Sequence, residues 1–137
     1  MKTIAEAQVI AGQTNYRQDI STREFSLTAD EPVSAGGQGA GPAPYDYLLA
    51  SLGACTAMTL QMYAQRKQWP LAGLRVALRL QKGRDGETHI ERLLHCDSPL
   101  SDEQWVRLIE IAGKTPVTRT LLAGSTIETA RAGSSGP

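Results

Sequence analysis

The stretch GPAPYDYLLASLGACTAMTL, residues 41 to 60, decides the fold of this chain. Its two prolines end a glycine-rich loop and favour the start of a helix, because proline fits the first helical turn. Apolar residues then recur at spacings of three and four over 44–67, with no charged residue between Asp46 and Arg66. We therefore predict a helix over 44–67, buried centrally because it is apolar on all sides.

Strands are expected on both sides of this helix. Short alternations of apolar and polar residues, typical of half-buried strands, occur at 5–12, 23–29, 74–81 and 88–97. Turn residues between the last two segments predict a β-hairpin. Residues 123–129 are a candidate edge strand.

A second helix is expected to begin after Ser101. Ser101 and Gln104 form a capping box, and Leu100 and Trp105 occupy the two positions of a hydrophobic staple. Pro116 is expected to close this helix.

Glycine fills four of the six positions in 36–41, so this segment is expected to be a loop. Its spacing does not match the glycine patterns of nucleotide-binding loops. We expect the glycines to let the backbone pass close to a neighbouring subunit.

The composition limits the possible classes of protein. Fourteen basic residues balance fourteen acidic ones, so no overall charge favours binding to nucleic acid or to an anionic membrane. No apolar stretch is long enough to span a membrane, and the two cysteines have neither metal-ligand nor disulfide-framework spacing. We expect a soluble cytoplasmic protein without metal or cofactor, with one domain over 1–131 and a disordered tail over 132–137.

Two segments resemble a known family. Residues 39–60 look like the first cysteine motif of the OsmC/Ohr family, and residues 108–121 are similar to the segment where that family usually has a Cys-Pro-Val motif. The resemblance implies an α+β OsmC-like fold, in which antiparallel sheets wrap two central helices of an intertwined homodimer. It also implies active sites at the subunit interface.

The resemblance further implies a function, the thiol-dependent reduction of organic hydroperoxides, with Cys55 as the peroxidatic nucleophile. In the family an arginine of the N-terminal hairpin assists this cysteine and is held by an acidic residue at the helix start. The nearest candidates here are Arg17 and Asp46. In a straight helix Asp46 would stand about 180° around and roughly 13 Å along the axis from Cys55. We therefore expect Arg17 and Asp46 to come from the other chain of a dimer.

The sequence departs from the family pattern at Thr115, where the second cysteine normally stands. That cysteine closes a disulfide with the oxidised nucleophile, and threonine cannot. The reaction would then need an external thiol or dithiol reductant, or Cys96 as a substitute.

Other interpretations remain open. Cys55 on an apolar helix could be ordinary core, and His89 and His95 share a strand face where exposed polar residues are expected. The alternative function is a non-catalytic binding module that holds a small apolar ligand at the dimer interface, with Cys55 as part of its wall. A dimer that serves only as a scaffold is a third possibility.

Overall fold

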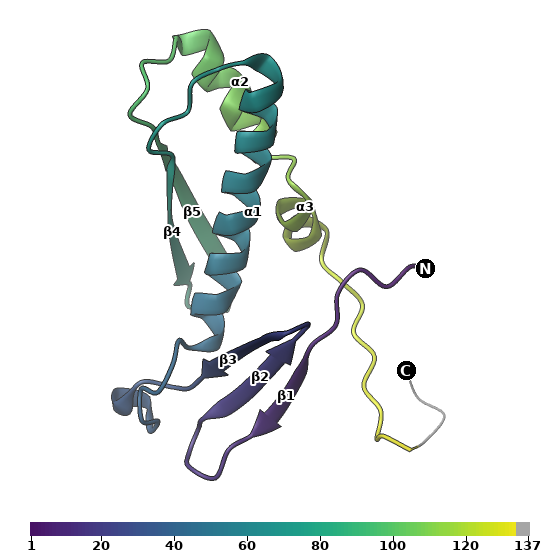
Figure 1. Cartoon of the computed structure of the whole chain (residues 1–137). Helices are drawn as coiled ribbons and strands as arrows, with labels where there is room; N and C mark the ends of the chain where they lie inside the picture. The colour runs from purple at the N-terminus through teal and green to yellow at the C-terminus, as the bar shows by residue number, and fades with distance from the viewer. Residues whose placement is uncertain (134–137) are drawn as a thin grey trace. The chain divides into compact units, whose positions relative to one another are not determined.

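The computed structural model describes residues 1–133, which divide into two compact units with the boundary after Ala50. The architecture is α+β with antiparallel sheets, which confirms the predicted fold class (Figure 1). The single domain over 1–131 stays a prediction. Of the predicted disordered tail, residues 134–137 lie outside the described part of the chain.

The first unit contains a three-stranded antiparallel sheet in the order β1-β2-β3. Its strands are β1 (Gln8–Ala11), β2 (Gln18–Thr22) and β3 (Phe25–Ala29). The strands expected over 5–12 and 23–29 are confirmed with shorter bounds, and β2 forms between them.

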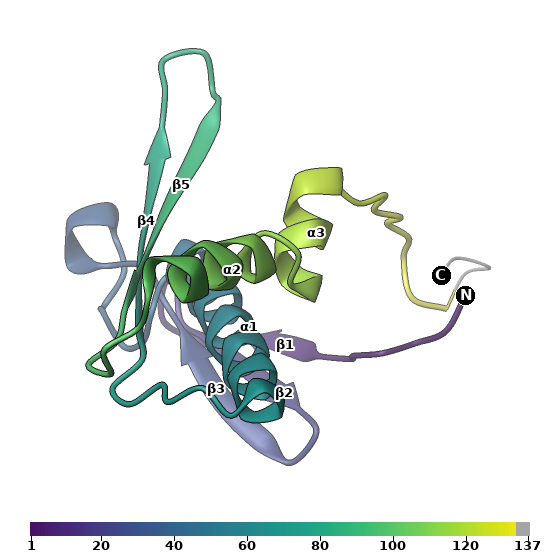
Figure 2. The ribbon, with the colours of Figure 1, turned by 90° about the horizontal axis from the view of Figure 1, so that it is seen from above.

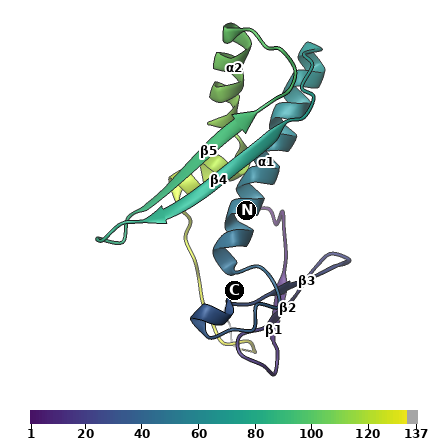
Figure 3. The ribbon, with the colours of Figure 1, turned by 90° about the vertical axis from the view of Figure 1, so that its left-hand side faces the viewer.

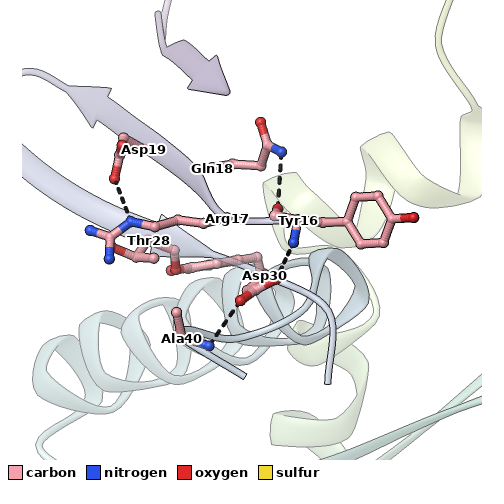
Figure 4. Close-up of polar contacts among 8 residues, drawn as sticks. Tyr16, Arg17, Gln18, Asp19, Thr28, Asp30 and Ala40 are labelled. Carbon is pink, nitrogen blue, oxygen red and sulfur yellow. Dashed lines mark hydrogen bonds and ion pairs between the residues drawn. The ribbon is translucent and has the colours of Figure 1, made fainter. Parts of the chain in front are cut away.

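Asp30, directly after β3, organises the glycine-rich loop. Its side chain is almost fully buried and accepts backbone N–H groups of Tyr16, Glu31, Gln38 and Ala40 at 2.7–3.2 Å. The Ala40 hydrogen bond contributes most to lowering the pKa of Asp30, and burial opposes it. One carboxylate thus satisfies backbone donors from three separate segments. Figure 4 shows its bonds to Tyr16 and Ala40.

Two glycines of this loop are required by close approach to the chain's own backbone. A Cβ atom at Gly37 would stand 2.1 Å from the carbonyl oxygen of Glu31, and one at Gly41 would stand 2.4 Å from that of Thr28. We expected an approach to a neighbouring subunit, but the contacts found here lie within the same unit.

Helix α1 (Pro44–Lys67) confirms the predicted central element. It begins with proline in its first turn, where the missing N–H is not needed, and ends before Gln68, which has a positive φ of 60°. The boundary between the two units falls within this helix, so α1 contributes its first two turns to one unit and the remainder to the other.

In the second unit a hairpin and α2 (Asp102–Ala112) pack against α1, and α3 (Pro116–Ala123) follows α2. The hairpin comprises β4 (Arg75–Lys82) and β5 (Thr88–His95), paired with Leu78 opposite Arg92. Figure 3 shows the hairpin lying across one side of α1, and Figure 2 shows α2 leading directly into α3.

The capping box at the start of α2 is present as predicted. The Ser101 hydroxyl accepts the backbone N–H of Gln104, whose side chain accepts the backbone N–H of Ser101. Leu100 and Trp105, the predicted staple positions, both pack against the core. The fully or nearly buried centre of that core comprises Leu60, Tyr63 and Leu108.

Helix α3 was not predicted, and the expected edge strand over 123–129 is wrong. Pro116 starts a helix instead of only closing one, because Thr115 caps it with its hydroxyl and proline fits the first turn. The last helical residue is Ala123, and 124–130 contains no strand.

One face of α1 remains exposed within the chain. Met58 and Met62 are 56% and 62% exposed, although the sequence predicted a helix buried on all sides. The hairpin and α2 cover only the opposite face, which carries Leu60 and Tyr63. Among residues 1–133, no helix is long and apolar enough to cross a lipid bilayer.

Candidate active site around Cys55

Cys55 lies near the middle of α1 and within the second unit. Its thiol is free and the residue is partly exposed, so it is neither closed into the core nor fully solvated. The next residue, Thr56, is fully buried and donates its hydroxyl to the carbonyl oxygen of Leu52. The helix therefore presents Cys55 at the edge of its packed face.

The guanidinium of Arg92 reaches this part of α1 from strand β5. One terminal nitrogen, Nη1, donates to the hydroxyl oxygens of Thr56 at 2.9 Å and Thr118 at 2.8 Å. The other, Nη2, donates to the carbonyl oxygen of Ala112 at 2.9 Å. Arg92 thus joins α1, the end of α2 and the first turn of α3.

Burial lowers the pKa of Arg92, and an electrostatic interaction with Cys55 partly opposes this effect. Guanidinium groups in proteins stay protonated at neutral pH. Arg92 therefore supplies a positive charge beside Cys55. Its partners in the described part of the chain are neutral oxygens, and it makes no ion pair there.

Thr115 and Thr118 form a buried pair of hydroxyl groups behind Arg92. Their Oγ1 atoms lie 2.6 Å apart, and Thr118 can also donate to the carbonyl oxygen of Ala112 at 3.2 Å. Thr115, at the position expected for a second cysteine, is fully buried and caps α3. Its hydroxyl serves the helix end and cannot form a disulfide.

An apolar pocket of about 680 Å³ opens beside Arg92. Its polar side chains are those of Arg92 and Thr118, and most of its other lining residues are apolar, from Leu52 on α1 to Trp105 on α2. Cys55 is not part of this lining, but Leu52 lies one helical turn before it. The pocket therefore combines apolar walls with one cationic group.

Arg17 and Asp46 lie in the first unit, where each has a local partner. Arg17 Nε donates to Asp19 Oδ1 at 3.1 Å in an exposed ion pair, visible in Figure 4. Asp46 accepts the backbone N–H of Ala43 at 2.9 Å and so caps the start of α1. Their assignment to the Cys55 site stays a prediction.

Cys96 follows directly after β5, and its thiol donates to the carbonyl oxygen of Ala72 at 3.4 Å. The Arg92 side chain contacts Thr56, and Cys96 follows Arg92 by four residues, which corresponds to roughly 13 Å along a strand that rises about 3.3 Å per residue. A disulfide requires Cα atoms about 4.4–6.8 Å apart. This arrangement does not favour Cys96 as the resolving partner of Cys55 in the same chain.

Arg92 is the residue that sequence reasoning missed. A signal was present, because Ile90, Arg92 and Leu94 occupy alternate positions of one strand and therefore share a face. A lone charge between two apolar residues on the inward face indicates a buried polar contact. Among residues 1–133, no cluster of three or more His, Cys, Asp or Glu residues could hold a metal ion.

Comparisons with known proteins agree with this architecture. The crystal structure of an OsmC-like protein from Mycoplasma pneumoniae superposes with a TM-score of 0.76 at 20% identity, covering 89% of each chain. An organic hydroperoxide resistance protein OsmC from Legionella pneumophila gives 0.68 at 16% identity, covering 87% of this chain and 89% of that chain. The organic hydroperoxide resistance protein OhrB of Bacillus subtilis gives 0.61 at 18% identity, covering 86% and 90%.

At these identities the superpositions show the fold. No curated protein matches the sequence. A family model described as OsmC-like protein matches residues 37–130, which include α1 with Cys55, the hairpin with Arg92, and both threonines. Since this match covers more than half of the chain, the protein belongs to the OsmC-like protein family.

Proposed function

We propose that this protein reduces organic hydroperoxides, with Cys55 as the nucleophile. The Cys55 thiolate attacks the terminal peroxide oxygen, an S–O bond forms, and the O–O bond breaks. The sulfur becomes a sulfenic acid, while the alkoxide leaves and takes a proton to become an alcohol. Sulfur is oxidised by two electrons and the peroxide is reduced by two.

The observation that carries this proposal is the partial exposure of the Cys55 thiol one helical turn from an apolar pocket. A hydroperoxide with an apolar substituent could place that substituent against the pocket wall and its O–O bond toward the thiol. Two of the proteins with similar structures are organic hydroperoxide resistance proteins, which agrees with this chemistry.

The proposed cycle is completed by an external thiol or dithiol. One thiol condenses with the sulfenic acid to give a mixed disulfide and water, and a second thiol releases Cys55 together with the oxidised reductant. Threonine at position 115 and the distance of Cys96 along the hairpin both favour this route. We also propose a cytoplasmic location, since free cysteines suit a reducing compartment.

The working form is proposed to be a homodimer. We propose that the exposed face of α1 with Met58 and Met62 forms the dimer interface. This face is apolar, and exposing apolar surface to water is unfavourable in free energy. In this dimer Arg17 and Asp46 are proposed to reach the partner's site. Met58→Glu is expected to shift the protein from dimer to monomer in sedimentation analysis, and an unchanged mass would contradict this interface.

The test of the reaction is chemical trapping. Treatment with one equivalent of cumene hydroperoxide is expected to produce a dimedone adduct on Cys55 in the wild type and in Cys96→Ser, but not in Cys55→Ser. Consumption of the peroxide with dithiothreitol is expected to depend on Cys55 alone. The absence of any adduct, together with no turnover across thiol reductants, would remove the enzymatic function.

The pocket also supports the second candidate, a non-catalytic binding module for a small apolar ligand, because most of its lining residues are apolar. In that case Cys55 would not react with iodoacetamide at neutral pH, while an apolar ligand would raise the melting temperature. The two candidates therefore differ in the reactivity of one thiol.

A further inference from the structure

We propose that Arg92 is the cation that stabilises the thiolate of Cys55, and that Thr118 is the residue that positions it. This inference rests on the proposed function. The sequence led us to expect that Arg17 of the other chain assists Cys55, whereas Arg92 belongs to the same chain as Cys55. Arg92 lies on the inward face of β5, in the same unit as Cys55.

The first argument is the lack of an acidic partner. A partly buried positive charge is normally compensated by a carboxylate, because removing a charge from water is costly. Arg92 is half-buried, yet its hydrogen bonds go to two hydroxyl groups and one carbonyl, and no described residue forms an ion pair with it. The guanidinium is instead bonded to the residue next to Cys55, and an electrostatic interaction with Cys55 raises the pKa of Arg92 against the effect of burial.

The second argument is the fixed position of the guanidinium. It donates to Thr56, the residue next to Cys55, and to Thr118 and Ala112 on the other side. Three bonds from three elements leave little freedom for a side chain that otherwise has many rotamers. The charge is therefore held in place before any reaction, as electrostatic stabilisation requires.

The other charged groups of the second unit are directed elsewhere. Arg79 and Glu91 pair on the outer face of the hairpin. Arg119 on α3 donates to the carbonyl oxygen of Lys114. The nearest charged residue after Cys55 on its own helix is Arg66, three turns further on.

Further charged groups of α2 and the hairpin also have other partners or lie on another face. Arg107 pairs with Glu110 and donates to Tyr63, two helical turns beyond Cys55 on α1. The histidines of β5, His89 and His95, occupy the outer face opposite to that of Arg92. Among these charged groups, Arg92 is the one with an electrostatic interaction with Cys55.

The same cation suits both stages of the reaction. Before attack the negative charge is on the Cys55 sulfur, and after the O–O bond breaks it is on the departing alkoxide. Within residues 1–133, the hydrogen bonds of Arg92 to Thr56, Thr118 and Ala112 leave some of its N–H groups able to donate to either species. A guanidinium at this position increases the fraction of reactive thiolate and stabilises the charge that develops on the alkoxide.

A purely structural role for Arg92 makes a different prediction, namely loss of stability without any change in thiol chemistry. The distinguishing measurement is the rate of Cys55 alkylation by iodoacetamide as a function of pH, in a Cys96→Ser background. We compare the parent with Arg92→Gln, Arg92→Lys, Thr118→Val and Arg17→Gln. Arg75→Gln is the matched control, since Arg75 is an exposed arginine of the same hairpin.

Arg92→Gln is expected to slow alkylation at pH 7 by about tenfold and to move the midpoint of the rate profile upward, because a nearby positive charge favours the thiolate. Arg92→Lys is expected to recover part of this rate, and Arg75→Gln to match the parent. Circular dichroism checks that each variant is folded. If Arg92→Gln does not fold, Thr118→Val is used instead. Its Cys55 is then expected to be alkylated severalfold more slowly than that of the parent.

A folded Arg92→Gln variant with the same pH profile of alkylation as the parent would overturn the inference. If Arg92→Gln does not fold, an unchanged alkylation rate in Thr118→Val would overturn it. The proposed function fails separately, if Cys55 of the parent is neither alkylated nor oxidised by hydroperoxide. A change in the profile of Arg17→Gln alone would assign the role to the N-terminal hairpin and also overturn the inference.

Discussion

Thr118→Val removes the hydroxyl that connects Arg92 to α3 while preserving the shape of the side chain. Thr118 is 8% exposed, so water cannot replace the missing group. Its oxygen accepts from Arg92 at 2.8 Å and lies 3.2 Å from the carbonyl oxygen of Ala112 and 2.6 Å from Thr115 Oγ1. The substitution therefore breaks one charged and two neutral contacts in a single step.

The expected loss of stability follows from these contacts. A hydrogen bond to a charged group contributes about 1.5–3 kcal/mol, and a neutral one about 1 kcal/mol. The extra methyl group of valine offsets part of the sum, and Arg92 keeps its bonds to Thr56 and Ala112. We expect a decrease of about 3 kcal/mol in the free energy of unfolding, or about 10 °C in melting temperature for a domain of this size.

Urea unfolding followed by circular dichroism measures this difference, at one protein concentration because a dimer would link stability to concentration. The matched control is Thr120→Val, an exposed threonine on the same helix. Its change is expected to stay within about 0.5 kcal/mol. If Thr118→Val were no less stable than this control, the hydroxyl network would not hold α3 to Arg92.

Three further outcomes are expected. Thr115→Cys introduces a thiol two hydrogen bonds away from Arg92, and mass spectrometry after hydroperoxide treatment should detect a disulfide between this position and Cys55. If mass spectrometry found free thiols at positions 55 and 115 after this treatment, the two side chains would not be close enough to form a disulfide. Folding lowers the pKa of Asp30, so the Asp30 carboxylate stabilises the fold at pH values above its ordinary pKa of 3.8. This stabilisation is lost as the pH falls through the lower pKa of the folded state. Asp30→Asn should thus be less stable than the wild type at neutral pH, with a gap that narrows toward about pH 3, and a pH-independent gap in urea midpoints would refute this. Gly37→Ala places a Cβ atom 2.1 Å from a backbone oxygen and should cost about 2 kcal/mol or more; an unchanged midpoint would show that the loop can move.

Local sequence signals predicted most of the regular structure. The extent of α1, the hairpin and the start of α2 each follow from periodicity or from capping residues that act within a few positions of one another. Pro116 was misinterpreted because proline both ends and begins helices. The capping role of Thr115 shows which applies here.

The candidate site was only partly predictable. Cys55 was identified through its motif, and the lack of a resolving cysteine at Thr115 was visible in the sequence. Arg92 was not identified, because its contacts with Thr56 and Thr118 join residues 36 and 26 positions apart. The alternation around Arg92 indicates that it faces inward, but no local pattern encodes which residues it contacts.

The sequence by itself determined most of the elements of this protein, its apolar central helix and the cysteine on it, because these depend on residue spacing along the chain. The tertiary structure decided which charge approaches that cysteine, since strand β5 must pack against α1 before Arg92 can reach the residue next to it. It also decided that one face of α1 stays exposed, because the hairpin and α2 cover only the other face.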